Sequence, residues 1–349
     1  MRAMVLHQQG PAEQRGLRLE EVPLPSPGPG EVRVCVNVCG VCHTDLHIVE
    51  GDIHPPKFPV IPGHQIVGTV DALGAEVQSH REGDRVGVPW LYSTDGTCGY
   101  CRRGQENLCE GARFTGFHVH GGYAECVIVP AASAYSIPRA FTDLNAAPLL
   151  CAGVIGYRSY RLSGIRKGET IALLGFGGSA HIVLQLARHE GCNVYVITRS
   201  EKHQRLAREL GAAWVGTAQE IPPTLADAAI VFAPAGGLVL TALRGIRKGG
   251  TVALAGITMS DIPQMPYDLI YHERVLRSVA NSTHQDVREF LSLAAEVPIH
   301  TTVDEFRLEH ANEAILAMKH SEMEGAAVLR VSQVLSDGTV GGWHDTQFA

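Results

Sequence analysis

The stretch that decides the fold is TIALLGFGGSA, residues 170–180. Its apolar run leads into Gly175-x-Gly177-x-x-Ala180, the spacing of a strand-to-helix turn that holds a dinucleotide. Gly175 permits the tight turn, Gly177, with Gly178 beside it, lets the backbone approach a pyrophosphate, and Ala180 lets the helix pack on the strand. A glycine-rich turn without a ligand is the alternative. The strand before it, the helix after it and a second strand about 20 residues later favour the cofactor site.

Apolar runs and helical stretches alternate around this motif. The runs are 171–174, 194–197, 229–232 and 252–255, and the helical stretches include 179–190 and 201–210. Continuous apolar runs are typical of parallel strands that crossover helices cover on both faces. Residues 153–281 are therefore predicted to form an α/β domain with a doubly wound parallel sheet.

The chain on either side of this domain has a different pattern. Residues 1–152 are rich in Gly, Pro and Val, and the alternation in Glu31–Val36 predicts a strand with one buried face. A helical stretch at Gln285–Glu296 and a strand at Ala326–Val331 have no sheet of their own, so we expect residues 282–349 to return to the mostly-β N-terminal lobe. The polar tail is expected to fray or to pack on a neighbouring subunit.

Composition excludes several classes of protein. Among 349 residues, 29 Lys and Arg face 36 Asp and Glu, a net charge of −7, with no basic block to bind nucleic acid. No apolar run reaches the roughly 18 residues of a membrane helix, and the N-terminus lacks a signal-peptide pattern. The sequence predicts a cytoplasmic protein whose nine cysteines serve as metal ligands and core thiols.

Three residues predict a metal centre. Cys42 and His64 offer a thiolate and an imidazole among glycines, and Cys151 offers a second thiolate. This donor set suits Zn²⁺ better than Mg²⁺ or Ca²⁺. Because three protein ligands leave one tetrahedral position open for water or substrate, the pattern indicates a catalytic zinc.

With these motifs in this order, the chain resembles the zinc-dependent medium-chain alcohol dehydrogenases over nearly its whole length. The resemblance implies a GroES-like catalytic domain, a Rossmann domain, and hydride transfer between a primary or secondary alcohol and NAD(P)(H). It also implies an aldehyde or ketone as the other substrate, and a homotetramer, the common state of bacterial members.

The resemblance implies roles for the residues around Cys42. Thr44 would take the proton of the alcohol, and His47 would pass it to water. Asp45 would orient a zinc-bound imidazole, and His43 would contact the cofactor pyrophosphate. Trp90 resembles an aromatic residue that narrows the substrate pocket, although it could equally belong to the core.

Two positions depart from the family pattern. Gln65 stands where a glutamate usually lies beside the zinc histidine, which removes a carboxylate suspected of assisting ligand exchange. Ala326 stands where many relatives have an arginine for the pyrophosphate, so cofactor affinity would be lower or supplied by another residue.

The end of the second predicted strand bears on the choice of cofactor. Thr198, Arg199 and Ser200 stand where an acid would bond the ribose 2′-hydroxyl of NAD. Hydroxyls and a guanidinium suit a 2′-phosphate, which favours NADP(H). The alternative is a solvent-facing Arg199 that caps the next helix.

A second metal site is predicted in the N-terminal lobe. Cys98, Cys101 and Cys109 match the last three ligands of the structural zinc lobe of the family, and Asp95 stands in place of the first cysteine. An Asp-Cys₃ site would be closed and structural. A three-cysteine remnant without metal and a redox pair at Cys98 and Cys101 are the alternatives.

Two other functions stay open at this point. A zinc-free quinone reductase on the same fold would need Cys42, His64 and Cys151 not to bind metal. A non-enzymatic dinucleotide-binding protein has its only support in Gln65 and Ala326.

Overall fold

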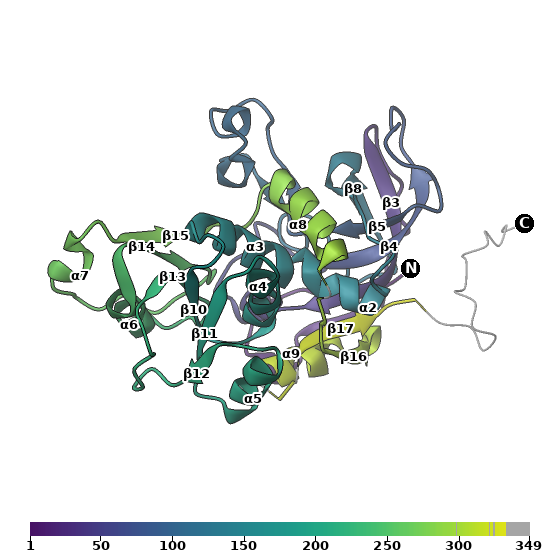
Figure 1. The fold of residues 1–349 in the computed structure, drawn as a ribbon. Coiled ribbons are helices and arrows are strands. Elements are labelled where there is room, and N and C mark those ends of the chain that lie inside the picture. The colour runs from purple at the N-terminus through teal and green to yellow at the C-terminus, as the bar shows by residue number, and fades with distance from the viewer. Residues whose placement is uncertain (298, 321, 324, 333–349) are drawn as a thin grey trace, which may run out of the picture.

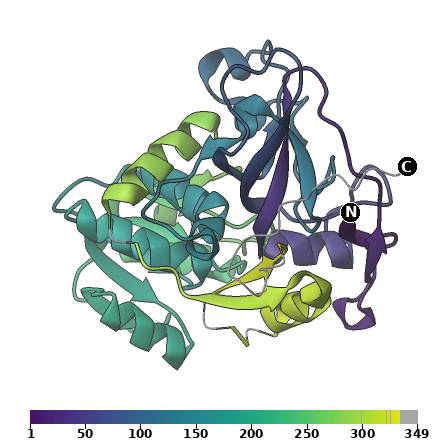
Figure 2. The ribbon, with the colours of Figure 1, turned by 90° about the vertical axis from the view of Figure 1, so that its right-hand side faces the viewer.

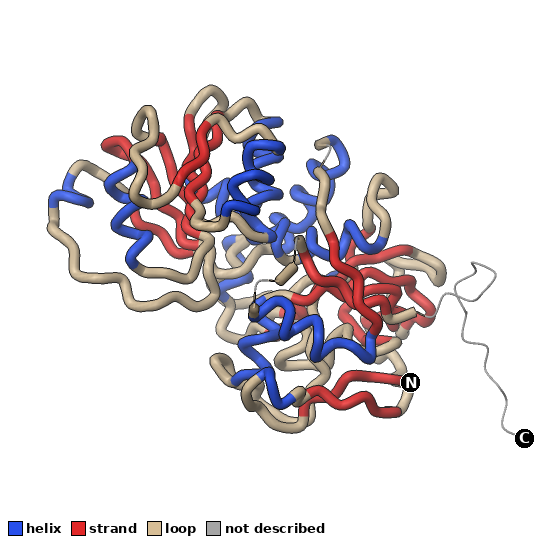
Figure 3. The backbone as a smooth tube through the Cα atoms, turned by 90° about the horizontal axis from the view of Figure 1, so that it is seen from below, coloured by secondary structure: helices blue, strands red, loops and turns tan. Residues whose placement is uncertain are grey.

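The computed structural model describes residues 1–297, 299–320, 322–323 and 325–332. Its elements form two lobes, each with its own sheet (Figures 1 and 3). The tail predicted to fray or to pack on a neighbour, residues 336–349, lies outside the described residues. Within them, no helix combines the length and the apolar character needed to cross a membrane.

One lobe contains six parallel strands in the order β12-β11-β10-β13-β14-β15. This is the order of a doubly wound dinucleotide-binding sheet. Its strands are β10 (Thr170–Leu174), β11 (Asn193–Ile197), β12 (Trp214–Gly216), β13 (Ala226–Val231), β14 (Ile246–Leu254) and β15 (Val275–Ser278). Its helices are α3 (Ala152–Ser163), α4 (Gly178–His189), α5 (Glu201–Glu209), α6 (Gly237–Gly245) and α7 (Asp268–Tyr271).

Helices cover both faces of this sheet, as the apolar runs predicted. Val183 of α4 and Ala207 of α5 belong to the core on one face, and Val239 and Leu243 of α6 belong to the core on the other. The edge strands β12 and β15 lacked a sequence signal because most of their residues are partly or fully exposed.

The other lobe contains a seven-stranded sheet in the order β16-β17-β3-β4-β5-β9, with β8 also paired to β3. Its strands are β3 (Glu31–Val41), β4 (Gln65–Leu73), β5 (Arg85–Val88), β8 (Cys126–Pro130), β9 (Tyr135–Ser136), β16 (Val303–Arg307) and β17 (Ala326–Arg330). Two smaller pairs are β1 (Arg2–Leu6) with β2 (Leu17–Glu21) and β6 (Leu91–Ser93) with β7 (Arg113–Phe114). The helices are α1 (His43–Glu50), α2 (Asp143–Ala146), α8 (His284–Glu296) and α9 (Ala311–Lys319).

A described C-terminal strand lies in the sheet of this lobe. Strand β17 pairs antiparallel with β3, with Ala327 opposite Val41 (Figure 2). Helix α8 begins at a capping box in which Thr283 and Asp286 bond each other's backbone N–H groups. Its Phe290 is fully buried in a core shared with β3, β4, α3 and α4. This shared core packs the two lobes against each other.

Candidate metal centre and cofactor site

The structure brings Cys42, His64 and Cys151 together from three separate segments. Their ligand atoms all lie within 4.8 Å of one another. Cys42 Sγ is 3.2 Å from His64 Nε2 and 4.0 Å from Cys151 Sγ. Ligands of a tetrahedral Zn²⁺ lie about 3.6–3.8 Å apart, given bonds of about 2.1 Å to nitrogen and about 2.3 Å to sulfur. The two observed separations lie on either side of this range, so small shifts of the side chains would fit the donors to a zinc ion.

Helix α1 holds the first thiol. Cys42 is the N-cap residue, and its Sγ accepts the backbone N–H of Thr44 at 3.3 Å. Asp45 Oδ2 accepts the backbone N–H of Cys42 at 2.9 Å, which completes a capping box. A negatively charged sulfur is favourable here because the N-terminal end of a helix carries a partial positive charge.

The other oxygen of Asp45 lies beside the imidazole. Asp45 Oδ1 accepts the backbone N–H of Gly63 at 3.1 Å and is 3.3 Å from His64 Nδ1. The Nδ1 contact is outside hydrogen-bond geometry, so this fully buried atom has no hydrogen-bond partner within the described part of the chain. When a metal takes Nε2, the proton must sit on Nδ1, and Asp45 is the acceptor within reach.

Without a metal, the donors Cys42 and His64 favour their protonated forms. The hydrogen bond with Cys151 and burial raise the pKa of the Cys42 thiol. Burial lowers the pKa of His64, but neighbouring Cys42 and Asp45 outweigh it and raise the pKa to about 10. A cation between these groups would replace the protons that they otherwise hold.

His47 lies at the end of α1, with both ring nitrogens in contact with polar groups. Nδ1 is 2.6 Å from Asp52 Oδ2, and Nε2 is 3.2 Å from Thr258 Oγ1 in the other lobe. Thr44 is 8% exposed in the first turn of α1. Sequence reasoning missed Asp52 and Thr258. Gly51 was a sequence signal for the end of the helix, where the chain turns back and brings Asp52 near His47. No nearby residue indicated that Thr258 would contact His47.

Trp90 lies against the metal-site histidine. Its ring centroid is 4.7 Å from that of His64, edge-on, and 5.1 Å from that of Phe114, stacked. Phe117 is a third aromatic neighbour, at 5.8 Å. Trp90 also packs on the core of its lobe. The ring therefore lies beside the candidate metal site and also contacts the core.

Gln65 is the first residue of β4 and is buried, opposite Gly40 of β3. A Cβ atom at Gly40 would come within 2.7 Å of Gln65 Oε1. The amide therefore lies over the glycine, and any side chain at position 40 would displace it.

The glycine turn has the predicted form. Gly175 has a φ of +90°, and Gly177 is the N-cap residue of α4 without a side-chain cap. Gly178 opens the helix, so the first backbone N–H groups of α4 have no partner within the helix. His43, expected near a pyrophosphate, is exposed in the first turn of α1.

The strand end after β11 differs in detail from the expectation. Thr198 is only 9% exposed, and Arg199 is exposed. Ser200 is the N-cap residue of α5, and its Oγ accepts the backbone N–H of His203 at 3.3 Å. The helix is thus capped by Ser200 and not by Arg199.

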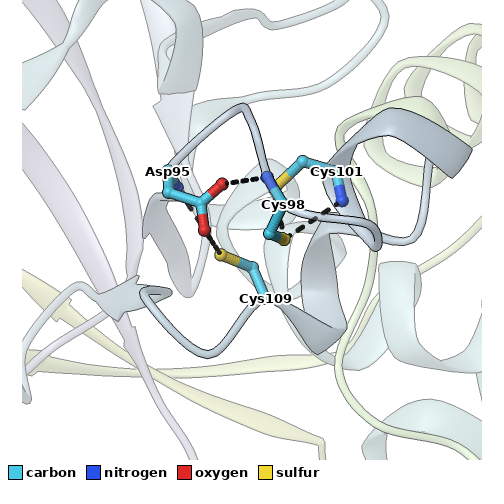
Figure 4. A group of neighbouring side chains, drawn as sticks. All are labelled: Asp95, Cys98, Cys101 and Cys109. Atoms are coloured by element: carbon cyan, nitrogen blue, oxygen red, sulfur yellow. Dashed lines mark hydrogen bonds between the residues drawn. The ribbon is translucent and has the colours of Figure 1, made fainter.

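The second predicted group also converges (Figure 4). The ligand atoms of Asp95, Cys98, Cys101 and Cys109 lie within 4.8 Å of one another. Cys98 Sγ is 3.6 Å from Cys101 Sγ, and Cys109 Sγ is 3.1 Å from Asp95 Oδ2. Asp95 Oδ1 accepts two backbone N–H groups, and that of Cys98 is the main reason why the pKa of Asp95 is lowered. The carboxylate is a charged oxygen donor that fits a fourth zinc ligand.

Comparison with known proteins agrees with this fold. Residues 28–139 match the alcohol dehydrogenase GroES-like domain, and residues 162–296 match the zinc-binding dehydrogenase domain. The probable alcohol dehydrogenase AdhA of Mycobacterium tuberculosis is 44% identical over 95% of this chain and 97% of its own. The chain belongs to the zinc-dependent medium-chain alcohol dehydrogenase family.

Solved structures in the comparison include complexes with both cofactors. The acetophenone reductase of Geotrichum candidum in complex with NAD has a TM-score of 0.85 and 25% identity, over 95% of this chain and 97% of that one. A putative zinc-binding dehydrogenase of Sinorhizobium meliloti bound to NADP has a TM-score of 0.83 and 27% identity, over 95% and 99%.

Proposed function

We propose that this protein is a zinc- and NAD(P)-dependent alcohol dehydrogenase that interconverts primary or secondary alcohols and the corresponding aldehydes or ketones. The observation that carries the proposal is the convergence of Cys42, His64 and Cys151, whose donor atoms lie within 4.8 Å of one another. When bound, Zn²⁺ supplies a Lewis acid for the substrate oxygen, and the nicotinamide supplies the hydride carrier.

The residues of α1 provide the proton path in this proposal. Thr44 Oγ1 takes the proton of the alcohol, and His47 accepts it from there. Asp52, which bonds His47 Nδ1 and is 54% exposed, passes it to water. Thr258 Oγ1 fixes the other side of the ring. A water-exposed carboxylate at the end of the path lets the proton leave without opening the site.

Trp90 forms one wall of the substrate pocket in this proposal. Its edge-on contact with His64 supports that role, because a bulky ring beside a metal ligand limits the room for the substrate. Gln65 supplies no carboxylate for ligand exchange, so we infer that exchange at the zinc proceeds without one.

The second site, Asp95 with Cys98, Cys101 and Cys109, is proposed to hold a structural zinc. Its short S–S and S–O separations and its charged carboxylate support this. A disulfide between Cys98 and Cys101 is the competing outcome, and intact-mass measurement of the native protein separates the two.

We further propose the domain division 1–152 with 282–349 and 153–281, which places each sheet in one domain. The cofactor is proposed to be NADP(H), because no acidic residue stands at Thr198, Arg199 or Ser200. Since Thr198 is buried and Arg199 is exposed, we infer that Arg199 accounts for most of this preference. A cytoplasmic location and a homotetramer complete the proposal, and light scattering of the purified protein measures the assembly.

Elemental analysis and a steady-state assay test the function together. We expect about two zinc ions per chain, one in the open set and one in the closed set, and oxidation of simple alcohols that stops when a chelator removes the metal. A metal-free chain that reduces quinones but not aldehydes would instead be a zinc-free reductase on this fold. A chain that binds cofactor and turns over neither would be a binding protein.

A further inference from the structure

A small pocket lies beside the glycine turn, at the carboxyl ends of β10 and β11. The turn and the first residues of α4 and α5 form its walls, and Thr302, Met323 and Gly325 of the other lobe close it. Dinucleotides bind at this edge of a doubly wound sheet. One lining residue, His181, has no role in the function proposed above.

His181 is buried with one ring nitrogen unused. The side chain is 5% exposed, and Nδ1 is 3.2 Å from the carbonyl oxygen of Gly177. Nε2 is buried and has no hydrogen-bond partner among the residues that the structure describes. An unpaired buried polar atom is unfavourable by about 1–3 kcal/mol, so natural proteins keep few of them without a reason.

The surroundings of this nitrogen favour an anion. None of the described lining residues carries a carboxylate, and the N-terminus of α4 has no side-chain cap. The ionisable neighbours on α5 are His203, which lines the pocket, and Lys202, which donates to the carbonyl of Met323. Burial lowers the pKa of His181 and of His203, so both rings are neutral at pH 7 before an anion arrives.

We propose that His181 binds the diphosphate of the nicotinamide dinucleotide through Nε2. The inference rests on the proposed function, since it needs a dinucleotide at the glycine turn. Nδ1–H keeps its hydrogen bond to the Gly177 carbonyl. Nε2 takes up a proton from the buffer, and the resulting Nε2–H donates a hydrogen bond to a phosphate oxygen, so binding takes up one proton. The imidazolium then adds charge to a site that the helix N-terminus already favours.

Two substitutions of His181 distinguish the roles of its two ring nitrogens. The amide of His181→Asn reaches the place of Nδ1 and keeps the Gly177 contact, whereas that of His181→Gln reaches the place of Nε2. His189→Asn, at the exposed end of the same helix, is the control for removing an imidazole from α4. Binding of ADP-ribose and of adenosine is measured by calorimetry, with thermal unfolding as a check of the fold.

We expect His181→Asn to bind ADP-ribose about 10- to 100-fold more weakly than wild type, as for the loss of a charged hydrogen bond. His181→Gln should lose less, and adenosine affinity should stay unchanged in all variants. Calorimetry in two buffers of different ionisation enthalpy should show proton uptake by the wild type and less by His181→Gln.

Equal ADP-ribose affinity of wild type and His181→Asn would overturn the inference, as would a loss for His181→Gln alone, which marks Nδ1 and a structural role. A parallel loss of adenosine affinity would place the contact on the ribose and overturn the diphosphate assignment. Wild-type protein that binds neither ADP-ribose nor NAD(P)H would refute the proposed function itself.

Discussion

At the scale of a single residue, Asp45 contacts the segments that carry two donors of the proposed metal centre. One oxygen bonds the backbone of Cys42, and the other bonds the backbone of Gly63 and faces His64. Because the carboxylate is completely buried, it has no water to replace these partners. The positions of a thiolate and an imidazole 22 residues apart in the sequence therefore depend on one side chain.

The hydroxyl of Thr44 can be removed without disturbing the cap of α1, since the backbone N–H, not the side chain, bonds Cys42. We expect Thr44→Ala to lower kcat by about 10²–10⁴-fold, the usual contribution of a general acid–base group. Thr44→Ser should restore much of it, and His47→Gln should be milder because water reaches the outer end of the path. Steady-state kinetics at neutral pH measure this, and full activity of Thr44→Ala would refute the relay.

Gly63 precedes the metal-site histidine in a backbone conformation that favours glycine. Its φ is +98°, and a Cβ there would lie 2.4 Å from Cδ1 of Tyr123. We expect Gly63→Ala to reduce zinc content and to destabilise the protein by more than the about 1–2 kcal/mol of left-handed strain alone. Gly83→Ala is the matched control, because Gly83 has a φ of +89° with open space around it. Equal unfolding free energies of the two variants would show that Tyr123 does not constrain this turn.

At the scale of elements, helix α1 positions functional groups with both of its ends. Its N-cap residue, Cys42, is one of the proposed metal donors. Its C-cap residue, Gly51, has a φ of 93°, and the chain turns back there so that the N–H of Asp52 bonds the carbonyl of His47. The eight residues of α1 thus link the proposed metal site to the proposed exit of the proton.

The segment 95–109, which carries the proposed structural zinc site, has little regular structure beyond two short 3₁₀ helices, 101–103 and 106–108. We expect Asp95→Ala to lose the structural zinc and to lower Tm, while the catalytic zinc stays. Asp95→Cys should keep both ions, because it restores a ligand although it also removes the contacts of Oδ1 with backbone N–H groups. Zinc analysis and thermal unfolding decide this. Two zinc ions in Asp95→Ala would show that Asp95 is only a turn residue.

At the scale of the whole molecule, one core joins the metal centre to the cofactor site. Helix α3 follows Cys151 directly and packs on α4, where a Cβ at Gly156 would come within 2.7 Å of Val183. Phe290 of α8 closes this core, and a Cβ at Gly153 would lie 2.5 Å from its ring. Hydride transfer requires fixed positions of substrate and nicotinamide. This packing fixes the position of the proposed metal donor Cys151 relative to the glycine turn.

Cofactor choice belongs to the same scale, because residues of both lobes line the pocket beside the glycine turn. We expect a higher kcat/KM with NADP(H) than with NAD(H), and a shift toward NAD(H) in Arg199→Ala and Thr198→Asp, since one charge-assisted contact contributes about 1.5–3 kcal/mol. Arg205→Ala, exposed on α5, controls for the general loss of a positive charge. A wild type that prefers NAD(H), or a Thr198→Asp variant that still favours NADP(H), would refute a phosphate site at this strand end.

Local patterns in the sequence predicted the parts whose signals are local. Continuous apolar runs predicted β10, β11, β13 and β14, because a strand covered on both faces must be apolar throughout. The glycine spacing predicted the turn before α4, since few residues other than glycine adopt a positive φ. The donor types in Cys42, His64 and Cys151 and in the Asp95 group predicted two clusters, which the fold then brought together.

The tertiary structure decided the contacts that no local pattern encodes. Thr258 contacts His47, 211 residues away in the sequence, and Phe114 of β7 stacks on Trp90. Burial of Thr198 and the unpaired Nε2 of His181 likewise depend on what packs above them. Periodicity and turn residues specify a segment's own conformation, whereas the neighbours of a side chain are specified only when distant segments pack together.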